Sequence, residues 1–490
     1  MAADSNRTRA SGDAGASLPR MPGRCRPLMR ALPALVIVTF LGVAVYRLGA
    51  PSLWFDEAAS WLNTSGSWQF LAQRVVQGED CGGFLYAVIL KIWTSGFGAS
   101  EQALRFPSVV AGCGFIALAT LLGRRIGGAA AGCYAGILAA CHPTTLFFAR
   151  QSRAYAFVLL ATAGCMYGAM ALRHSRRAAG ILLMGSSLLV TSLHIFGVLV
   201  PVGLLAWSLI ASRGRCASRE VRLVLPVSLS CMAIAAGWAM VMHERIASIL
   251  DDFWVRTTLV QAWSGVLREF LPLLYVSIPA LVAGSILLAR RKEHRSTFVL
   301  LTAIAATVAG GAILASLLTH GSHHFILPRY MLPLLPVLLL PIAILLSRLP
   351  VALGASCAVL LLGAWCYERP PQRLYRASDP WGLDSRAAAM HLLKNRRLDE
   401  RVLVFPEYEG VTLAYYGVGS HKAAGRRRQL DTLDRLQTDG VGYWLVFYGN
   451  QGQELQRQLL FNGHPLSARF GAIRVFEPFT QRTGPHSAAQ

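Results

Sequence analysis

Two adjacent acids, Asp56 and Glu57, occur in the stretch SLWFDEAASW, directly after the first long apolar run of the chain. A carboxylate at the boundary between water and bilayer can act as a general base, because reduced solvation and a nearby cation set its proton affinity. The alternative is that both acids solvate a loop and favour the N-terminus of a helix. The pair therefore predicts either a catalytic carboxylate or the polar start of a helix.

Arginines and tyrosines form the second set of candidate groups. Arg150, Arg153 and Tyr155 lie in FFARQSRAYAF, where one apolar run ends and the next begins, and Arg329 with Tyr330 precedes a later run. A guanidinium group can bind a phosphate through two parallel hydrogen bonds. Interfacial arginines also extend toward lipid headgroups without any catalytic role. The pattern indicates either a cationic clamp for a phosphate or an ordinary membrane interface.

Three histidines, His320, His323 and His324, are the candidate metal ligands of the sequence. No carboxylate stands beside them at a spacing suited to a metal site. We therefore predict no metal ligands and no certain cofactor, and we leave a divalent metal as an open expectation.

The composition places these groups in a membrane protein. Of 490 residues, 54% are hydrophobic and only 15% are charged, and the mean hydropathy is +0.45, unlike a soluble domain. In such a protein a net charge of +22 indicates basic cytoplasmic loops beside anionic headgroups, and not a nucleic-acid partner. The ten cysteines form no C-x-x-C pair, which is typical of small core residues.

Apolar windows long enough to span a bilayer recur along the chain, and we expect about eleven membrane-spanning helices. The two windows on either side of LHIF are the shortest pair. The windows lie near 31–50, 104–122, 128–147, 155–172, 179–194, 196–212, 222–242, 264–289, 297–318, 330–347 and 349–367.

Arginine and lysine in alternate connections orient the chain across the membrane. They predict a disordered basic cytoplasmic tail at 1–30, a transmembrane domain at 31–367 and an outward loop at 51–103. After residue 367 the hydropathy drops, and RVLVFPE, GYWLVFYG and GAIRVFEP indicate short strands, interleaved with helical patterns at 383–397, 429–438 and 451–460. We expect a small α/β domain at 368–490 on the extracytoplasmic (periplasmic) side, opposite the N-terminus.

Six collinear motifs resemble the C-type glycosyltransferase superfamily, specifically its bacterial protein mannosyltransferase-like and aminoarabinose-transferase-like membrane enzymes. The motifs are LWFDEA at 53–58, LYAVILKIW at 85–93, GASEQALRFPS at 98–108, QSRAY at 151–155, LHIF at 193–196 and RYMLPLLP at 329–336. Two of them depart from the family pattern. Gly82-Gly83-Phe84 replaces a His-Pro-Pro triplet, and Ser152 replaces an acid.

The resemblance implies a polytopic α-helical enzyme of the bacterial inner membrane. Such enzymes transfer a sugar from a polyprenyl phosphate, with inversion, to a lipid, glycan or protein acceptor on the outward face. The acid of the first outward loop is catalytic, which carries onto Asp56 with Glu57 as its support. A polyprenyl phosphate is a good leaving group, so one base and one cationic clamp suffice. The substrate-binding residues that we predict are Asp80, Tyr86, Arg153, Tyr155, His194, Arg329 and Tyr330.

Two other classes of protein compete with this interpretation. A flippase or transporter of lipid-linked sugars should carry ionisable residues at mid-membrane depth or two similar halves, and the sequence shows neither. A catalytically inactive membrane scaffold of the same fold is favoured by the two altered motifs, and opposed by the intact acid at Asp56.

Overall fold

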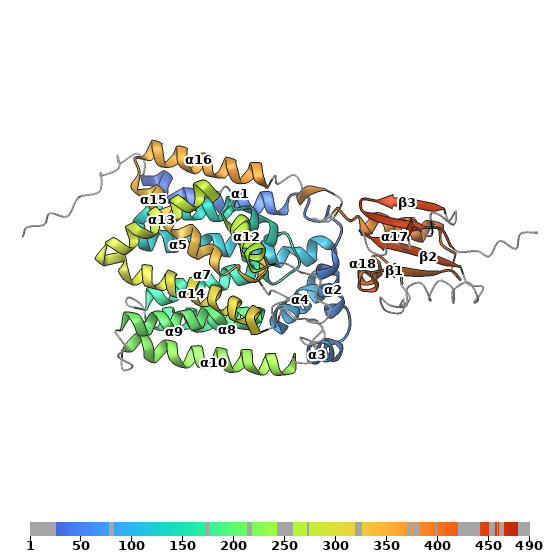
Figure 1. Ribbon diagram of the computed structural model, residues 1–490, viewed down its shortest axis with the longest axis horizontal. Coiled ribbons are helices and arrows are strands. Elements are labelled where there is room, and N and C mark those ends of the chain that lie inside the picture. The colour runs from blue at the N-terminus through green and yellow to red at the C-terminus, as the bar shows by residue number, and fades with distance from the viewer. Residues whose placement is uncertain are drawn as a thin grey trace, which may run out of the picture.

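The computed structural model shows an elongated helical body with a small α/β domain at one end (Figure 1). Asp80, the three histidines at 320, 323 and 324, and residues 1–25 lie outside the described residues. The structure describes residues 26–77, 83–172, 176–212, 218–242, 258–271, 274–318, 326–369, 374–376, 378, 382–397, 399–419, 442–449, 456–457, 459 and 465–478.

All eleven apolar windows are helical. Among the described residues, four helices are long and apolar enough to cross a membrane, a bent pair could form a fifth span, and the other apolar helices are shorter. The elements of the body are α1 (Arg26–Val45), α2 (Phe55–Ser65), α3 (Trp68–Val76), α4 (Phe84–Phe97), α5 (Glu101–Cys141), α6 (Pro143–Ala149), α7 (Tyr155–Ala171), α8 (Arg176–Leu193), η2 (Ile195–Val198), α9 (Leu199–Ala211), α10 (Arg219–Val241), α12 (Leu259–Phe270), α13 (Leu274–Arg290), η3 (Lys292–His294), α14 (Arg295–Leu318), η4 (Pro328–Tyr330), α15 (Leu334–Arg348) and α16 (Val351–Glu368).

The windows 104–122 and 128–147 form two helical segments, as the sequence predicts. α5 is broken between them at Gly128, where φ is 84°, and α6 forms the end of the second window. Only glycine adopts that backbone conformation readily, so the chain reverses there. A Cβ at Gly123 would lie 2.5 Å from the Ala131 carbonyl oxygen, so the two halves pack closely. The window 264–289, expected as one span, is divided into α12 and α13, which are bent relative to each other.

The outward loop 51–103 is largely helical and contains α2, α3 and α4. Buried apolar side chains on α1, α5, α7, α14 and α15 form one continuous core. On the outer helices α1 and α16, large apolar side chains such as Val38 and Leu360 are exposed, as expected for a surface that faces lipid.

The C-terminal domain contains a four-stranded sheet in the order β1-β2-β4-β3. Its strands are β1 (Arg401–Phe405), β2 (Tyr443–Tyr448), β3 (Leu466–Phe470) and β4 (Ile473–Phe476), with α17 (Ser385–Asn395), η6 (Glu407–Glu409) and α18 (Gly410–Tyr415). β1 and β2 are parallel, and the other neighbours are antiparallel. The predicted β1, β2 and β4 are confirmed, whereas β3 and α18 were not predicted. The helical pattern at 429–438, and most of that at 451–460, lie outside the described residues.

The C-terminal domain contacts the loop that leads into α2. The Leu53 N–H donates to the Tyr416 hydroxyl at 2.8 Å, and the Ser52 hydroxyl donates to the Leu383 carbonyl at 3.0 Å. Arg386 donates to the Gly49 carbonyl at 2.8 Å and pairs with Glu101 at 2.6 Å. Since α1 ends just before this loop, its first residues lie at the opposite end of the body from the sheet (Figure 1). Which end faces the cytoplasm stays a prediction.

Candidate active site

The two acids of α2 have different surroundings. Glu57 is 1% exposed, and Arg105 holds it through two parallel bonds, Nε to Oε1 at 2.8 Å and Nη2 to Oε2 at 2.6 Å. The Ser152 N–H also donates to Oε1, at 2.8 Å. Both carboxylate oxygens are therefore engaged by the protein, and Glu57 connects α2 to α5 and to the loop before α7.

Two buried arginines fix the chain on the N-terminal side of α2. Arg105 donates through Nη1 to the Leu48 and Pro51 carbonyls, each at 2.9 Å. Arg150 donates to the Ala44 carbonyl at 2.5 Å, so it binds carbonyls that α1 leaves without helical partners. Arg150 thus has a structural role, which differs from both the phosphate clamp and the headgroup contact suggested by the sequence.

Asp56 is accessible and lies between two arginines. Its side chain is 19% exposed, and Oδ2 is 3.5 Å from Arg329 Nη1. On the other side, Arg153 Nη1 donates to the Asp56 carbonyl at 3.4 Å and to Ser60 Oγ at 3.0 Å. The carboxylate is thus near a cation and partly exposed, so a substrate hydroxyl could come within hydrogen-bond reach, which a general base needs.

Three aromatic rings from distant parts of the chain surround Arg329. The His194 and Tyr330 rings are 4.9 Å apart, and those of Tyr155 and His194 are 6.5 Å apart. The Arg329 guanidinium lies 5.3 Å from the Tyr330 ring, within range of a cation–π contact. Burial alone would lower the pKa of Arg329, but Tyr155, Tyr330 and Asp56 outweigh it and raise the pKa, so this residue stays cationic.

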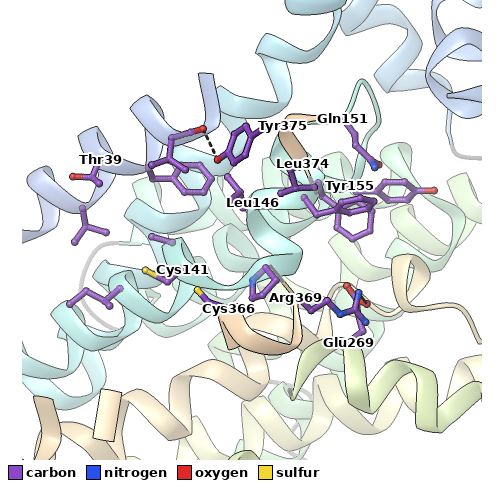
Figure 2. Close-up of a pocket in the computed structure, with 18 of the residues that line it drawn as sticks. Thr39, Cys141, Leu146, Gln151, Tyr155, Glu269, Cys366, Arg369, Leu374 and Tyr375 are labelled. Carbon is purple, nitrogen blue, oxygen red and sulfur yellow. Dashed lines mark hydrogen bonds and ion pairs between the residues drawn. The ribbon is translucent and has the colours of Figure 1, made fainter. Parts of the chain in front are cut away.

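A cavity of about 780 Å³ adjoins Arg329 (Figure 2). Most of its wall is apolar, with lining residues from α1, from the end of α5 and from α6. Its polar lining includes Trp54, Gln151, Tyr155 and Arg329. Leu35, which lines the cavity, is 58% exposed on the outer face of α1, so the apolar part opens toward the lipid.

A salt bridge occupies another part of the cavity wall. Glu269 at the end of α12 pairs with Arg369 at 2.6 Å, and Thr144 donates to the Glu269 carboxylate at 2.9 Å. Both charged residues line the cavity and are labelled in Figure 2. Sequence reasoning missed this pair, because 100 positions separate its members and neither lies in a recognised motif.

The structure brings most of the predicted site residues together. Those that meet at Arg329 are Asp56, Arg153, Tyr155, His194 and Tyr330.

Two of the predicted site residues lie elsewhere, and a third is not among the described residues. Tyr86 is buried, with its hydroxyl 3.3 Å from Ser152 Oγ, and it does not line the cavity. The Glu57 side chain is buried and paired with Arg105. Asp80 is outside the described residues. Sequence reasoning missed Gln151 and Trp54, although both stand in recognised motifs beside chosen residues.

Metal-binding groups do not gather in the described part of the chain. No three His, Cys, Asp or Glu side chains there lie close enough together to hold a metal ion. The expectation of a divalent metal therefore stays open, because Asp80 and the three histidines are outside that part.

This architecture is that of a polytopic membrane protein with the C-type glycosyltransferase fold. Its features are the helical body, the helices that follow the first span and the terminal α/β domain. The similar solved structures bear this out. ArnT from Cupriavidus metallidurans in the apo state has a TM-score of 0.60 at 13% identity, over 90% of this chain and 97% of that one.

The same ArnT bound to undecaprenyl phosphate gives a TM-score of 0.59 at 14% identity, covering 92% of this chain and 99% of that chain. The arabinofuranosyltransferase AftD from Mycobacteria gives 0.53 at 14% identity, over 92% of this chain but only 40% of that chain. At these identities the likeness concerns the fold. By sequence, the chain matches no family model and no curated protein.

Proposed function

We propose that this protein transfers a sugar from a polyprenyl phosphate to an acceptor hydroxyl, with Asp56 as the general base. The observation that carries the proposal is the position of Asp56, 3.5 Å from an arginine at the polar end of a lipid-open apolar cavity. A polyprenyl chain fits the apolar wall, and its phosphate fits Arg329. One structure of the same fold holds undecaprenyl phosphate, which supports this class of donor.

In this mechanism the acceptor hydroxyl gives its proton to Asp56, and its oxygen attacks the anomeric carbon. The bond from that carbon to the phosphate oxygen breaks with inversion, and its electron pair stays on the polyprenyl phosphate. Arg329 stabilises the charge that develops on the leaving phosphate. When donor enters, Arg329 turns from Asp56 to the phosphate, which releases the carboxylate for proton transfer.

Arg153 and Glu57 have supporting roles in the proposal. Arg153 binds the Asp56 carbonyl and Ser60, so its contacts suit the positioning of α2 better than a clamp on the phosphate. Glu57 fixes the same helix through Arg105. The Tyr330 ring contacts the Arg329 guanidinium, and the His194 ring packs against Tyr330.

The test uses purified full-length protein in detergent and a panel of undecaprenyl-phosphate sugars, with a mixture of lipid, glycan and peptide acceptors. We expect Asp56→Asn to lower turnover by a factor of roughly 10² to 10⁴, the range for removing a general base, while donor binding changes little. Turnover equal to that of the wild type would remove Asp56 from the role of base. Binding without turnover in the wild type would favour an inactive scaffold.

A further inference from the structure

The side chain of Gln151 is buried, and it forms no hydrogen bond with the described residues. It is 3% exposed and lines the large cavity, yet neither Oε1 nor Nε2 has a hydrogen-bond partner among the described residues. A buried amide without partners is costly, and folded proteins satisfy such groups with protein, water or ligand. Gln151 and Tyr155 both line this cavity and are labelled in Figure 2.

The backbone on both sides of Gln151 is fixed, so its position does not result from a loose loop. Arg150 binds the carbonyls at the end of α1, and the Ser152 N–H donates to the buried Glu57 carboxylate. The Gln151 carbonyl itself accepts from the Arg153 N–H at 2.9 Å. The unpaired amide is thus presented from a rigid support, as expected for a group that is preorganised for a ligand.

We propose that Gln151 recognises a hydroxyl group of the donor sugar, next to the phosphate held by Arg329. A carboxamide offers one acceptor and one donor group, and both are unpaired here. A sugar hydroxyl also donates and accepts, so it satisfies both atoms. A phosphate only accepts and would leave Oε1 unpaired. This inference rests on the proposed function, and it makes Gln151 a specificity-determining residue for the sugar.

A second cavity offers a competing partner for the amide. Its volume is about 20 Å³, and Trp54, Glu57, Arg105 and Gln151 contribute to its wall. That volume accommodates about one water molecule. A water molecule in this cavity would form hydrogen bonds with the amide whether or not a sugar is bound. The experiment described next distinguishes this case.

The experiment compares two ligands on purified full-length protein in detergent, with binding followed by tryptophan fluorescence, since Trp54 lines the cavity. The ligands are undecaprenyl phosphate and the undecaprenyl-phosphate hexose or pentose that the wild type binds most tightly. We expect Gln151→Leu to weaken binding of the sugar-bearing lipid about tenfold, and binding of undecaprenyl phosphate less than about twofold. Arg329→Ala should weaken both, and Gln73→Leu, an exposed change on α3, should weaken neither.

Thermal unfolding of the empty protein gives an independent measurement. Because the amide has no protein partner, Gln151→Leu should leave the melting temperature unchanged or raise it. Equal weakening of both lipids, no weakening of either, or a lower melting temperature would each overturn the assignment. Failure of the wild type to bind either lipid would instead contradict the proposed function.

Discussion

At the residue scale, neighbouring acids have separate tasks. Asp56 contacts one arginine at 3.5 Å and remains accessible, whereas Glu57 is enclosed by Arg105 and a backbone N–H. The side chains of adjacent helical residues point in different directions, so one reaches the site and the other the protein interior. The contacts favour one catalytic candidate, Asp56, and one structural anchor, Glu57, whereas the sequence predicted that both acids serve catalysis.

Glu57→Gln should destabilise the protein far more than Asp56→Asn. Removing the charge leaves Arg105 buried without its counterion, and breaking a buried ion pair in this way costs about 3–5 kcal/mol. Thermal unfolding of both variants in the same detergent measures the difference. Glu57→Gln combined with Arg105→Met should lose less than the sum of the single changes. Equal melting temperatures for wild type and Glu57→Gln would contradict the anchoring role.

At the element scale, the altered LYAVILKIW region has a packing explanation. Gly83 is the N-cap of α4 with φ 148°, a backbone conformation that favours glycine. A Cβ at this position would lie 2.5 Å from the Ser192 carbonyl oxygen and 2.6 Å from that of Leu193. The glycine thus lets α4 begin directly against the end of α8, beside His194. Gly83, which stands in place of part of the His-Pro-Pro triplet, thus allows α4 and α8 to pack closely near the site.

Gly83→Ala should therefore lower the stability of the protein by more than the roughly 1–3 kcal/mol of backbone strain alone, because the contact adds a clash. Gly96→Ala is the matched control on the same helix, since a Cβ there meets nothing within 4 Å. An alanine in that open helical position should stabilise by about 0.5–1 kcal/mol. Unfolding midpoints measure both effects, and equal midpoints for the two variants would contradict the packing argument.

At the scale of the whole molecule, the C-terminal domain is connected to the site through α2. Arg386 and Tyr416 hold the loop before α2, and the Tyr415 and Trp61 rings meet edge to face at 5.2 Å. The Phe55 ring, next to Asp56, contacts Tyr408 at 4.8 Å. Burial raises the pKa of Tyr416, so its hydroxyl stays protonated, and its oxygen accepts from the Leu53 N–H.

Arg386→Leu should lower turnover roughly tenfold to a hundredfold while leaving the binding of undecaprenyl phosphate within about twofold, because small misplacements of a reacting group are costly. No residue that lines the cavity lies beyond Tyr375, so the sheet and the helices of the C-terminal domain contribute no wall and binding should persist. Arg401→Leu is the control, since Arg401 donates to Tyr443 within the domain. Steady-state kinetics of both variants measure their turnover. Full activity in Arg386→Leu would show that domain docking does not position Asp56.

Hydropathy predicted the helices, and motif order predicted which loops meet. Asp56, Arg153, Tyr155, His194 and Arg329 come from four separate segments, and each was chosen from a short motif. The bend between α12 and α13 was missed because it lies inside an apolar pattern that predicts one span. The role of Gln151 was missed because burial without a partner depends on every neighbouring element.

The contacts that hold the loop before α2 also constrain the order of biosynthesis. Ser52 and Leu53 bond to residues 331 and 363 positions later in the chain. During translation, the segment bearing Asp56 is made early and lacks these supports until Leu383 and Tyr416 have been synthesised and the α/β domain around them has folded. A chain that stops before residue 383 would thus contain every motif of the proposed site without the contacts that fix the loop before α2.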